Sequence, residues 1–133
     1  MKLQPDSNQA SYSISAQGQG FVEVNHVRHL QGICLGTDAA PEPWGCAGFA
    51  ALTEADFTRL IALRPEIVII GTGTRQQFPP PSLLQPLMAQ GIGFEVMNTA
   101  AACRTYNILA SEGRRVVAGL VVSPTNTGTP DDL

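Results

Sequence analysis

The chain has 133 residues, of which 44% are hydrophobic and 14% are charged, and its net charge is −3. This length predicts one domain that can bury a core without disulfides or metal ions. The lack of any basic stripe disfavours binding to nucleic acid, and no apolar run approaches the roughly 20 residues that a membrane-spanning helix needs.

Both ends of the chain are predicted to be disordered. Residues 1–10 are polar, and residues 123–133 have no large apolar residue before the terminus, which leaves residues 11–122 as the single folded domain. Residues 1–20 lack the apolar segment of a secretory signal and do not resemble an Arg-rich transit peptide. We therefore expect a cytoplasmic protein.

The N-terminal third has the pattern of antiparallel β structure. Apolar and polar residues alternate from Tyr12 to Ala16 and again from Phe21 to Val24, which predicts a β-hairpin whose turn is longer than the tightest types. A further strand is predicted over residues 28–35. Residues 39–49, rich in proline and glycine, are predicted to form a loop.

That loop carries Trp44, the only tryptophan of the chain. A tryptophan buries a large apolar area, so we expect Trp44 to close one end of the core. The alternative is an exposed aromatic anchor for a partner, which would include a contact between two copies of the chain in a homodimer.

Two helices are predicted in the middle of the chain. The first begins at Thr53, a good N-cap with the acidic Asp56 at the third helical position, and ends before Pro65. The second begins with residues 82–85, which have the Ser-x-x-Gln pattern of a capping box, and ends at Gly91.

The C-terminal half alternates strands with helices. Residues 67–70 are apolar and β-branched throughout, which predicts a strand buried on both faces. Residues 92–97 form the next predicted strand, Thr99 is predicted to cap a third helix that runs to Ser111, and residues 115–122 form another buried strand.

These elements predict the fold class. Strands that alternate with helices across short links favour right-handed crossovers, and so predict parallel pairing of the last three strands. The N-terminal strands would extend or cover that sheet. The expected fold is α/β: a three-layer single domain, with a mixed sheet that has a parallel βαβαβ C-terminal half and an antiparallel N-terminal β region.

Two polar turns are predicted to meet at the carboxyl edge of neighbouring parallel strands, where α/β sheets usually bind ligands. Free N–H groups at the start of the third helix and two arginines would favour an anionic ligand. The candidate ligand-binding residues are Gly71, Thr72, Gly73, Thr74, Arg75, Asn98, Thr99 and Arg104. The alternative is that the glycines only allow a tight turn, that Thr99 only caps the helix and that both arginines are solvated. The turn matches neither a dinucleotide fingerprint nor a Walker A motif.

No catalytic residue, metal site or cofactor is predicted. Cys103 lies close to the apolar face of the third helix, with no histidine nearby in the sequence, which favours a core cysteine over a nucleophile. His26 and His29 would lie on opposite faces of a strand, so they do not form a metal pair. A helical wheel places Arg104 and Asn107 on the face opposite the apolar residues.

Two segments carry a resemblance to a known family. Residues 95–114, EVMNTAAACRTYNILASEGR, together with residues 69–74, IIGTGT, resemble a widespread family of small domains of unknown function. Its members include the mitochondrial respiratory complex I assembly factor 3 and the adipogenesis-associated Mth-domain protein. The likeness extends roughly from residue 14 to residue 122. The motif positions that match are Gly71, Thr72, Gly73, Met97, Thr99, Ala102, Arg104, Thr105, Tyr106, Asn107, Glu112 and Arg114.

The resemblance implies a compact three-layer α/β fold, no established enzymatic activity, and action through protein contacts. The charged fraction of 14%, below the roughly 25% of typical domains, also favours a partner. We therefore predict a non-enzymatic protein-interaction or assembly-type module, bacterial and cytosolic, with an unidentified protein partner. The alternative is an anionic-ligand binding protein or enzyme that uses the crevice between the two turns.

Overall fold

The computed structural model describes residues 10–124, which contain eight strands, three α-helices and one short 3₁₀ helix. The ends that were predicted to be disordered fall mostly outside these residues, so that prediction stays untested. In chain order the elements are β1 (Ile14–Gly18), β2 (Phe21–Val24), β3 (Val27–His29), β4 (Ile33–Gly36), β5 (Ala39–Pro43), the 3₁₀ helix (Phe49–Ala51), α1 (Glu54–Ala62), β6 (Ile67–Gly71), α2 (Pro81–Ala89), β7 (Gly93–Met97), α3 (Thr99–Ser111) and β8 (Val116–Leu120).

The central feature is a mixed five-stranded sheet of order β5-β4-β8-β6-β7. Its C-terminal half is parallel, because β6 pairs in parallel with both β7 and β8. Its other half is antiparallel, because β4 pairs in that sense with β5 and β8. The strands β1, β2 and β3 form a separate antiparallel sheet. The predicted mixed sheet and its parallel half are confirmed.

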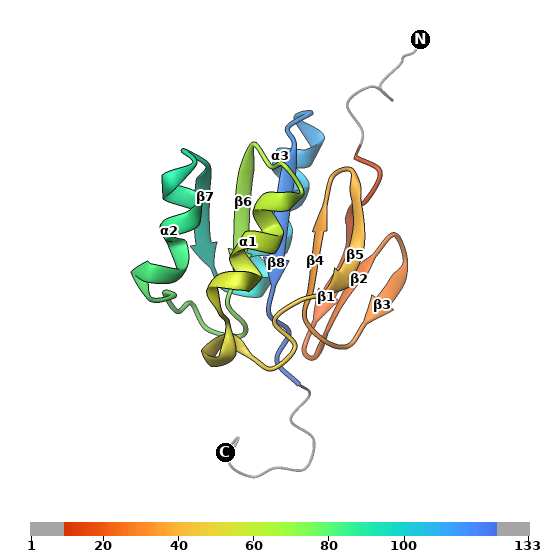
Figure 1. Ribbon diagram of the computed structural model, residues 1–133. Coiled ribbons are helices and arrows are strands. Elements are labelled where there is room, and N and C mark those ends of the chain that lie inside the picture. Colours follow the sequence, from red (N-terminus) through yellow and green to blue (C-terminus); the bar gives the residue numbers. More distant parts are fainter. Residues whose placement is uncertain (1–9, 125–133) are drawn as a thin grey trace.

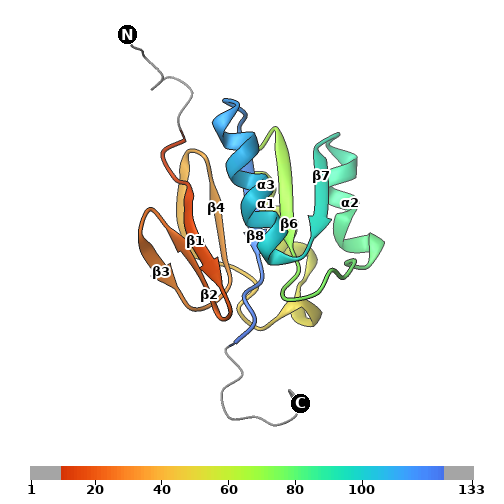
Figure 2. The same cartoon turned by 180° about the vertical axis from the view of Figure 1, so that it is seen from behind.

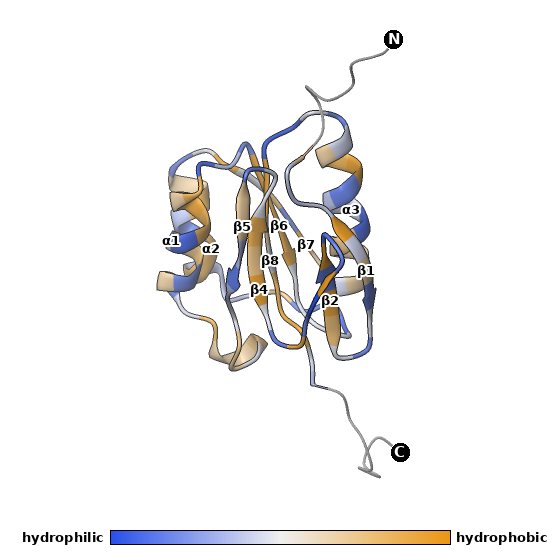
Figure 3. Cartoon of the chain, turned by 90° about the vertical axis from the view of Figure 1, so that its right-hand side faces the viewer, coloured by the Kyte–Doolittle hydropathy of each residue, from blue (hydrophilic) through white to orange (hydrophobic). Residues whose placement is uncertain are grey.

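The elements form three layers around this sheet (Figures 1 and 2). Helices α1 and α2 cover one face, and α3 with the small sheet covers the other (Figure 3). The buried residues of β6 alternate between the two cores, since Val68 and Ile70 pack with Phe57 and Leu87 while Ile69 packs with Tyr106. The two-sided burial predicted for residues 67–70 is therefore confirmed, apart from the partly buried Ile67.

The N-terminal third differs from the prediction in three places. The hairpin turn is a tight one of two residues, because Gly18 pairs with Phe21 and Gly20 takes a φ of 80° that glycine permits. The strand predicted over residues 28–35 is two strands in two sheets, β3 and β4. The loop predicted over residues 39–49 begins with the edge strand β5, a position where prolines are tolerated.

Trp44 closes the core under α1. Its side chain is 1% exposed, its Nε1–H donates to Asp56 O at 2.9 Å, and its ring meets Phe57 edge to face with centroids 5.9 Å apart. The expected core position is confirmed. The alternative of an exposed anchor, and with it a homodimer contact through Trp44, is wrong because the ring has no free surface.

The helix starts confirm one capping prediction and correct two. Thr53 is the N-cap of α1, as predicted, and it forms a capping box with Asp56. The box predicted at residues 82–85 is absent, because α2 begins with Pro81 at its first position and its N-cap, Pro80, makes no side-chain cap hydrogen bond. The N-cap of α3 is Asn98, whose Oδ1 accepts from the Ala101 N–H at 2.8 Å, and Thr99 is the first helical residue.

Candidate functional site

The two polar turns meet at one edge of the sheet, as parallel pairing of β6 and β7 requires (Figure 1). The Thr72 N–H donates to Met97 O, and the Thr99 N–H donates to Gly73 O, both at 2.9 Å. The predicted shared edge is therefore confirmed. Direct hydrogen bonds between the turns also show that they are joined to each other at these points.

Thr99 does more than begin a helix. Its buried hydroxyl accepts from the Gly73 N–H at 2.9 Å and donates to Val121 O at 2.6 Å. A Cβ at Gly71 would lie 2.9 Å from the Thr99 hydroxyl oxygen, so only glycine allows this approach. The side chain fastens the ends of β6 and β8 to the start of α3.

Most N–H groups at the start of α3 are already used within the chain. The Thr99 N–H binds Gly73 O, the Ala101 N–H binds Asn98 Oδ1, and the Ala102 N–H binds Asn98 O at 2.9 Å. Four N–H groups at this helix start have no intrahelical partner, those of Asn98, Thr99, Ala100 and Ala101. Of these, the N–H groups of Asn98 and Ala100 have no hydrogen-bond partner within residues 10–124. The helix start therefore offers an anion two free donors rather than four.

Thr72 closes its own turn. Its hydroxyl donates to Arg75 O at 2.6 Å and accepts from the Gln77 N–H at 3.1 Å. The side chain is 1% exposed, whereas Thr74 and Arg75 are exposed. The hydroxyl of Thr72 is thus engaged by the backbone of residues 75 and 77, and holds the shape of the turn.

A cavity of about 300 Å³ adjoins the two turns. Four of the predicted residues line it, namely Gly73, Thr74, Asn98 and Thr99; Gly71, Thr72, Arg75 and Arg104 do not. The sequence prediction missed the other walls, which are residues 17–21 of the β1–β2 hairpin, Ala100 and residues 121–123. The hairpin is far away in the sequence, and its only local signal is the pair Gly18 and Gly20.

The lining of this cavity is chemically neutral. Its side chains are apolar groups, hydroxyls and amides, with no carboxylate, imidazole, thiol, ammonium or guanidinium group among the lining residues. Arg104 lies on the exposed surface of α3. The arrangement can accept a small uncharged group against glycine backbone, and an anionic ligand stays a prediction.

A second cavity, of about 410 Å³, lies on the other side of residues 121–123. The strand exit that begins at Val121 thus separates two hollows, and Thr74 lines both of them. Thr72 contributes to the second cavity, together with the segment from Cys46 to Ala50. Of the eight predicted residues, five therefore line one or the other cavity.

Cys34 lies in a third cavity, of about 240 Å³, under Arg59. One Arg59 nitrogen, Nη2, is 4.0 Å from the Cys34 sulfur, 3.9 Å from Glu42 Oε1 and 2.9 Å from Pro43 O, to which it donates. Burial raises the pKa of the Cys34 thiol, and the Arg59 charge opposes this only in part. The thiol is therefore protonated at neutral pH and a poor nucleophile.

Cys103 is a core residue, as the sequence predicted. It is 2% exposed, and burial raises its pKa to about 12. Across residues 10–124 there is no group of three or more His, Cys, Asp or Glu side chains that could hold a metal ion. Within the same residues, none of the helices combines the length and the apolar character needed to cross a membrane.

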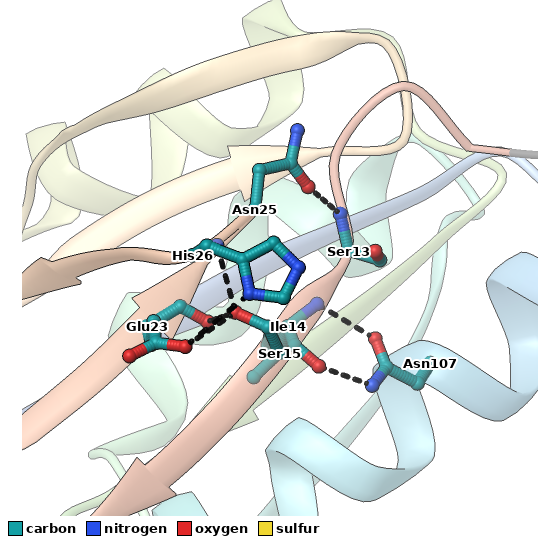
Figure 4. A network of polar contacts seen from close by, with 7 residues as sticks. All are labelled: Ser13, Ile14, Ser15, Glu23, Asn25, His26 and Asn107. Carbon is teal, nitrogen blue, oxygen red and sulfur yellow. Dashed lines mark hydrogen bonds and ion pairs between the residues drawn. The ribbon is translucent and has the colours of Figure 1, made fainter.

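Two motif residues of α3 bind the N-terminal segment. The Tyr106 hydroxyl donates to Tyr12 O at 2.7 Å. The Asn107 side chain accepts from the Ile14 N–H at 2.9 Å and donates to Ile14 O at 2.7 Å (Figure 4). The helical wheel had placed Asn107 opposite the apolar face. That was wrong, because the small sheet packs beside α3 and turns this position into a contact.

A family model described as a protein of unknown function, DUF498/DUF598, matches residues 14–121. A bovine (Bos taurus) protein named NADH dehydrogenase (ubiquinone) 1 alpha subcomplex assembly factor 3 is 36% identical, over 94% of this chain and 68% of its own length. The human protein of the same name is 35% identical over the same shares.

Solved structures share the fold. A Bordetella parapertussis protein is 39% identical, with a TM-score of 0.81 over 86% of this chain and 98% of that one. A Bordetella pertussis protein described as a Mth938-like domain is 33% identical, with a TM-score of 0.78 over 96% of each chain. The likeness in fold therefore extends over most of this chain.

Proposed function

We propose a protein-interaction role of the assembly type for this chain, which belongs to the DUF498/DUF598 family of proteins of unknown function. The observation that carries the proposal is the likeness to proteins named as assembly factors, which extends over 94% of this chain. The chain works as a binding surface in a bacterial cytoplasm and catalyses no reaction of its own.

The roles of the motif residues support this proposal. Thr72, Thr99, Tyr106 and Asn107 all use their polar groups on backbone atoms of the same chain. These four polar side chains therefore serve the fold, and recognition is left to the exposed surface. Large apolar side chains on that surface are Val27 (59% exposed), Leu30 (70%), Phe78 (71%), Met88 (48%) and Ile108 (59%).

A capture experiment with matched variants tests the proposal. Tagged chain is incubated with extract of its native host, and captured proteins are quantified against it. We expect one protein at a near-equimolar ratio, with capture reduced by Phe78→Asp and unchanged by Ser82→Asp, a charge added at an exposed position of the same crossover. Recovery of no stoichiometric partner would count against an assembly role.

The second candidate function is a small-ligand site in the cavity beside Gly73 and Thr99. It is favoured by a volume of about 300 Å³, at the lower end of the range for ligand pockets. A thermal shift screen against phosphates, nucleotides, carboxylates and neutral amides tests it. A ligand at 100 times its dissociation constant adds about 2.7 kcal/mol of stability.

A pair of neighbouring substitutions makes that screen specific. Ala100→Leu fills part of the cavity that Ala100 lines, while Ala101→Leu adds the same group at a position outside the lining. A compound that still binds after both substitutions binds outside this cavity. If no compound stabilises the protein, this candidate function is wrong. Arg104→Ala reports separately on the predicted anionic ligand. Sedimentation at two concentrations tests whether the chain forms a homodimer.

A further inference from the structure

Within residues 10–124 the two sheets have four strand edges, and three of them are protected against pairing. Unprotected edges present free N–H and C=O groups to other chains, so natural proteins cover or shorten them. The β5 edge contains Pro41 and Pro43, which have no N–H, and Arg59 donates to Pro43 O at 2.9 Å. The β3 edge has three residues.

The β1 edge is closed by a side chain. Asn107 accepts from the N–H and donates to the C=O of Ile14, which is how a neighbouring strand would pair with this residue (Figure 4). Its amide thus takes the place of a further strand at Ile14, the first residue of β1. Pairing of β1 with another chain would have to break both hydrogen bonds.

The β7 edge is less protected than these three, because within residues 10–124 only the side-chain amide of Gln76 binds its outward-facing backbone groups. It is five residues long, contains no proline or lysine, and pairs on one side only, with β6. Met97 O accepts from the Thr72 N–H at the end of β6, so the backbone groups of Met97 face β6. Neighbouring residues of a strand point their N–H and C=O groups in opposite directions. The N–H and C=O groups of Phe94 and Val96 therefore point away from β6.

One side chain reaches that edge in the described chain. The Gln76 side-chain amide donates to Val96 O at 3.0 Å, at an exposed position. Three other backbone groups of this edge form no hydrogen bond with any residue from 10 to 124: the N–H groups of Phe94 and Val96, and Phe94 O. Two donors and one acceptor in register are therefore open to an added strand.

The side chains beside the edge indicate what the added strand carries. Phe94 and Val96 are partly buried and belong to the core under α1 and α2, whereas Glu95 is exposed on the other side of the strand. Exposed apolar side chains, Phe78 and Met88, lie on the crossover that joins β6 to β7. An added strand of alternating apolar and basic residues fits both sides of this edge: its apolar residues lie beside Phe94 and Val96, and its basic residues lie beside Glu95.

Charge favours a different protein over a second copy of this one. Antiparallel self-pairing about the centre of β7 would place Glu95 opposite its own copy, and like charges directly opposite each other destabilise a sheet. The net charge of −3 also opposes self-association. A basic residue opposite Glu95 would instead be attracted.

We propose that the open edge of β7 binds an extended segment of a partner protein as a further strand, with a basic residue placed against Glu95. The inference rests on the interaction role proposed above and names its surface. Backbone hydrogen bonds supply the attachment, the apolar side chains set the register, and Glu95 selects against acidic segments.

Nuclear magnetic resonance on the isotope-labelled full chain tests this with defined probes. The first probe is a capped five-residue peptide of alternating valine and lysine; the second has glutamate in place of lysine; the third is the first with N-methylated amides. We expect the first to shift and protect the Phe94 and Val96 amides, the second to bind about fivefold more weakly at low salt, and the third not to bind. Glu95→Lys should reverse the preference between the first two.

Three results would overturn the proposal: no change at the Phe94 and Val96 amides, binding undiminished by N-methylation, or a preference that Glu95→Lys leaves unchanged. Concentration-dependent dimers that protect these amides would assign the edge to a second copy and overturn the choice of occupant. If a stoichiometric partner is captured from extract but none of these peptide effects occurs, the assembly role stands and only its surface is wrong.

Discussion

Gly73 and Thr99 bind each other in both directions. The Thr99 N–H donates to Gly73 O, and the Gly73 N–H donates to the Thr99 hydroxyl, each at 2.9 Å. The same hydroxyl donates to Val121 O at 2.6 Å. One buried side chain thus connects the ends of β6 and β8 with the start of α3. At the predicted ligand site, these polar groups therefore bind each other within the chain.

Thr99→Val should destabilise the protein by about 2–4 kcal/mol. It keeps the shape of the side chain but leaves the Gly73 N–H and Val121 O without a partner, and each unsatisfied buried group costs about 1–3 kcal/mol. Urea unfolding measures the loss. Thr99→Ser keeps the hydroxyl and serves as the control, with a loss of about half that or less. A Thr99→Val protein as stable as the parent would contradict the role given to this hydroxyl.

Gly119→Ala should destabilise the protein by about 1–3 kcal/mol or more, because it overfills a packed core. A Cβ at Gly119 would lie 2.8–2.9 Å from three atoms of the Trp44 ring, which is itself held by Asp56 O and Phe57. Calorimetry should show a lower Tm. The control is Gly93→Ala, where a Cβ has no neighbour within 4 Å, and where Tm should change little.

Asn107→Ala should open the β1 edge. Two hydrogen bonds to Ile14 are lost, which should cost about 1–3 kcal/mol in stability. Amide exchange at Ile14 should become between about fivefold and about 150-fold faster, since each 1.4 kcal/mol of opening free energy is a factor of ten. Arg104→Ala, at an exposed position of the same helix, is the control. Unchanged exchange at Ile14 would show that something else protects this edge.

Stability should fall as the pH rises above about 9. Burial raises the pKa of the Cys103 thiol to about 12 in the folded chain, from its ordinary value of 9.0. Between these values the unfolded chain loses this proton and the folded chain keeps it, so unfolding becomes easier by up to about 1.4 kcal/mol per pH unit. Cys103→Ala should make the free energy of unfolding fall less steeply with pH between pH 9 and 11. Between pH 6 and 8, the difference in this free energy between the parent and Cys103→Ala should stay constant.

Part of the alkaline slope should remain in Cys103→Ala. Burial also raises the pKa of Tyr106, and its hydroxyl donates to Tyr12 O. The same sign applies, because the folded chain again keeps a proton that the unfolded chain loses. Denaturant titrations at several pH values measure both slopes. An identical slope in the parent and in Cys103→Ala would contradict the contribution of Cys103.

Local rules of the sequence predicted the framework. Three features of this framework depend only on neighbours within a few residues. They are the apolar run at residues 67–70, the helix cap at Thr53, and the position of Asn98 and Thr99 after β7. Parallel order then followed from alternation of strands and helices, and with it the meeting of the two turns at one edge. The capping box expected at residues 82–85 failed because the N-cap of α2 is Pro80, two residues before Ser82.

Contacts between distant segments decided the rest. Asn107 looked like a solvent-facing residue on a helical wheel and became the closure of β1, 93 positions away. The hairpin at residues 17–21 became a wall of the cavity beside Gly73, while Arg75 and Arg104 stayed outside it. The periodicity of a helix or strand indicates which of its sides is apolar. It does not indicate which other element packs against a given side. That information arises only when the small sheet docks beside α3, and the open edge of β7 is visible only once the strand order of the sheets is known.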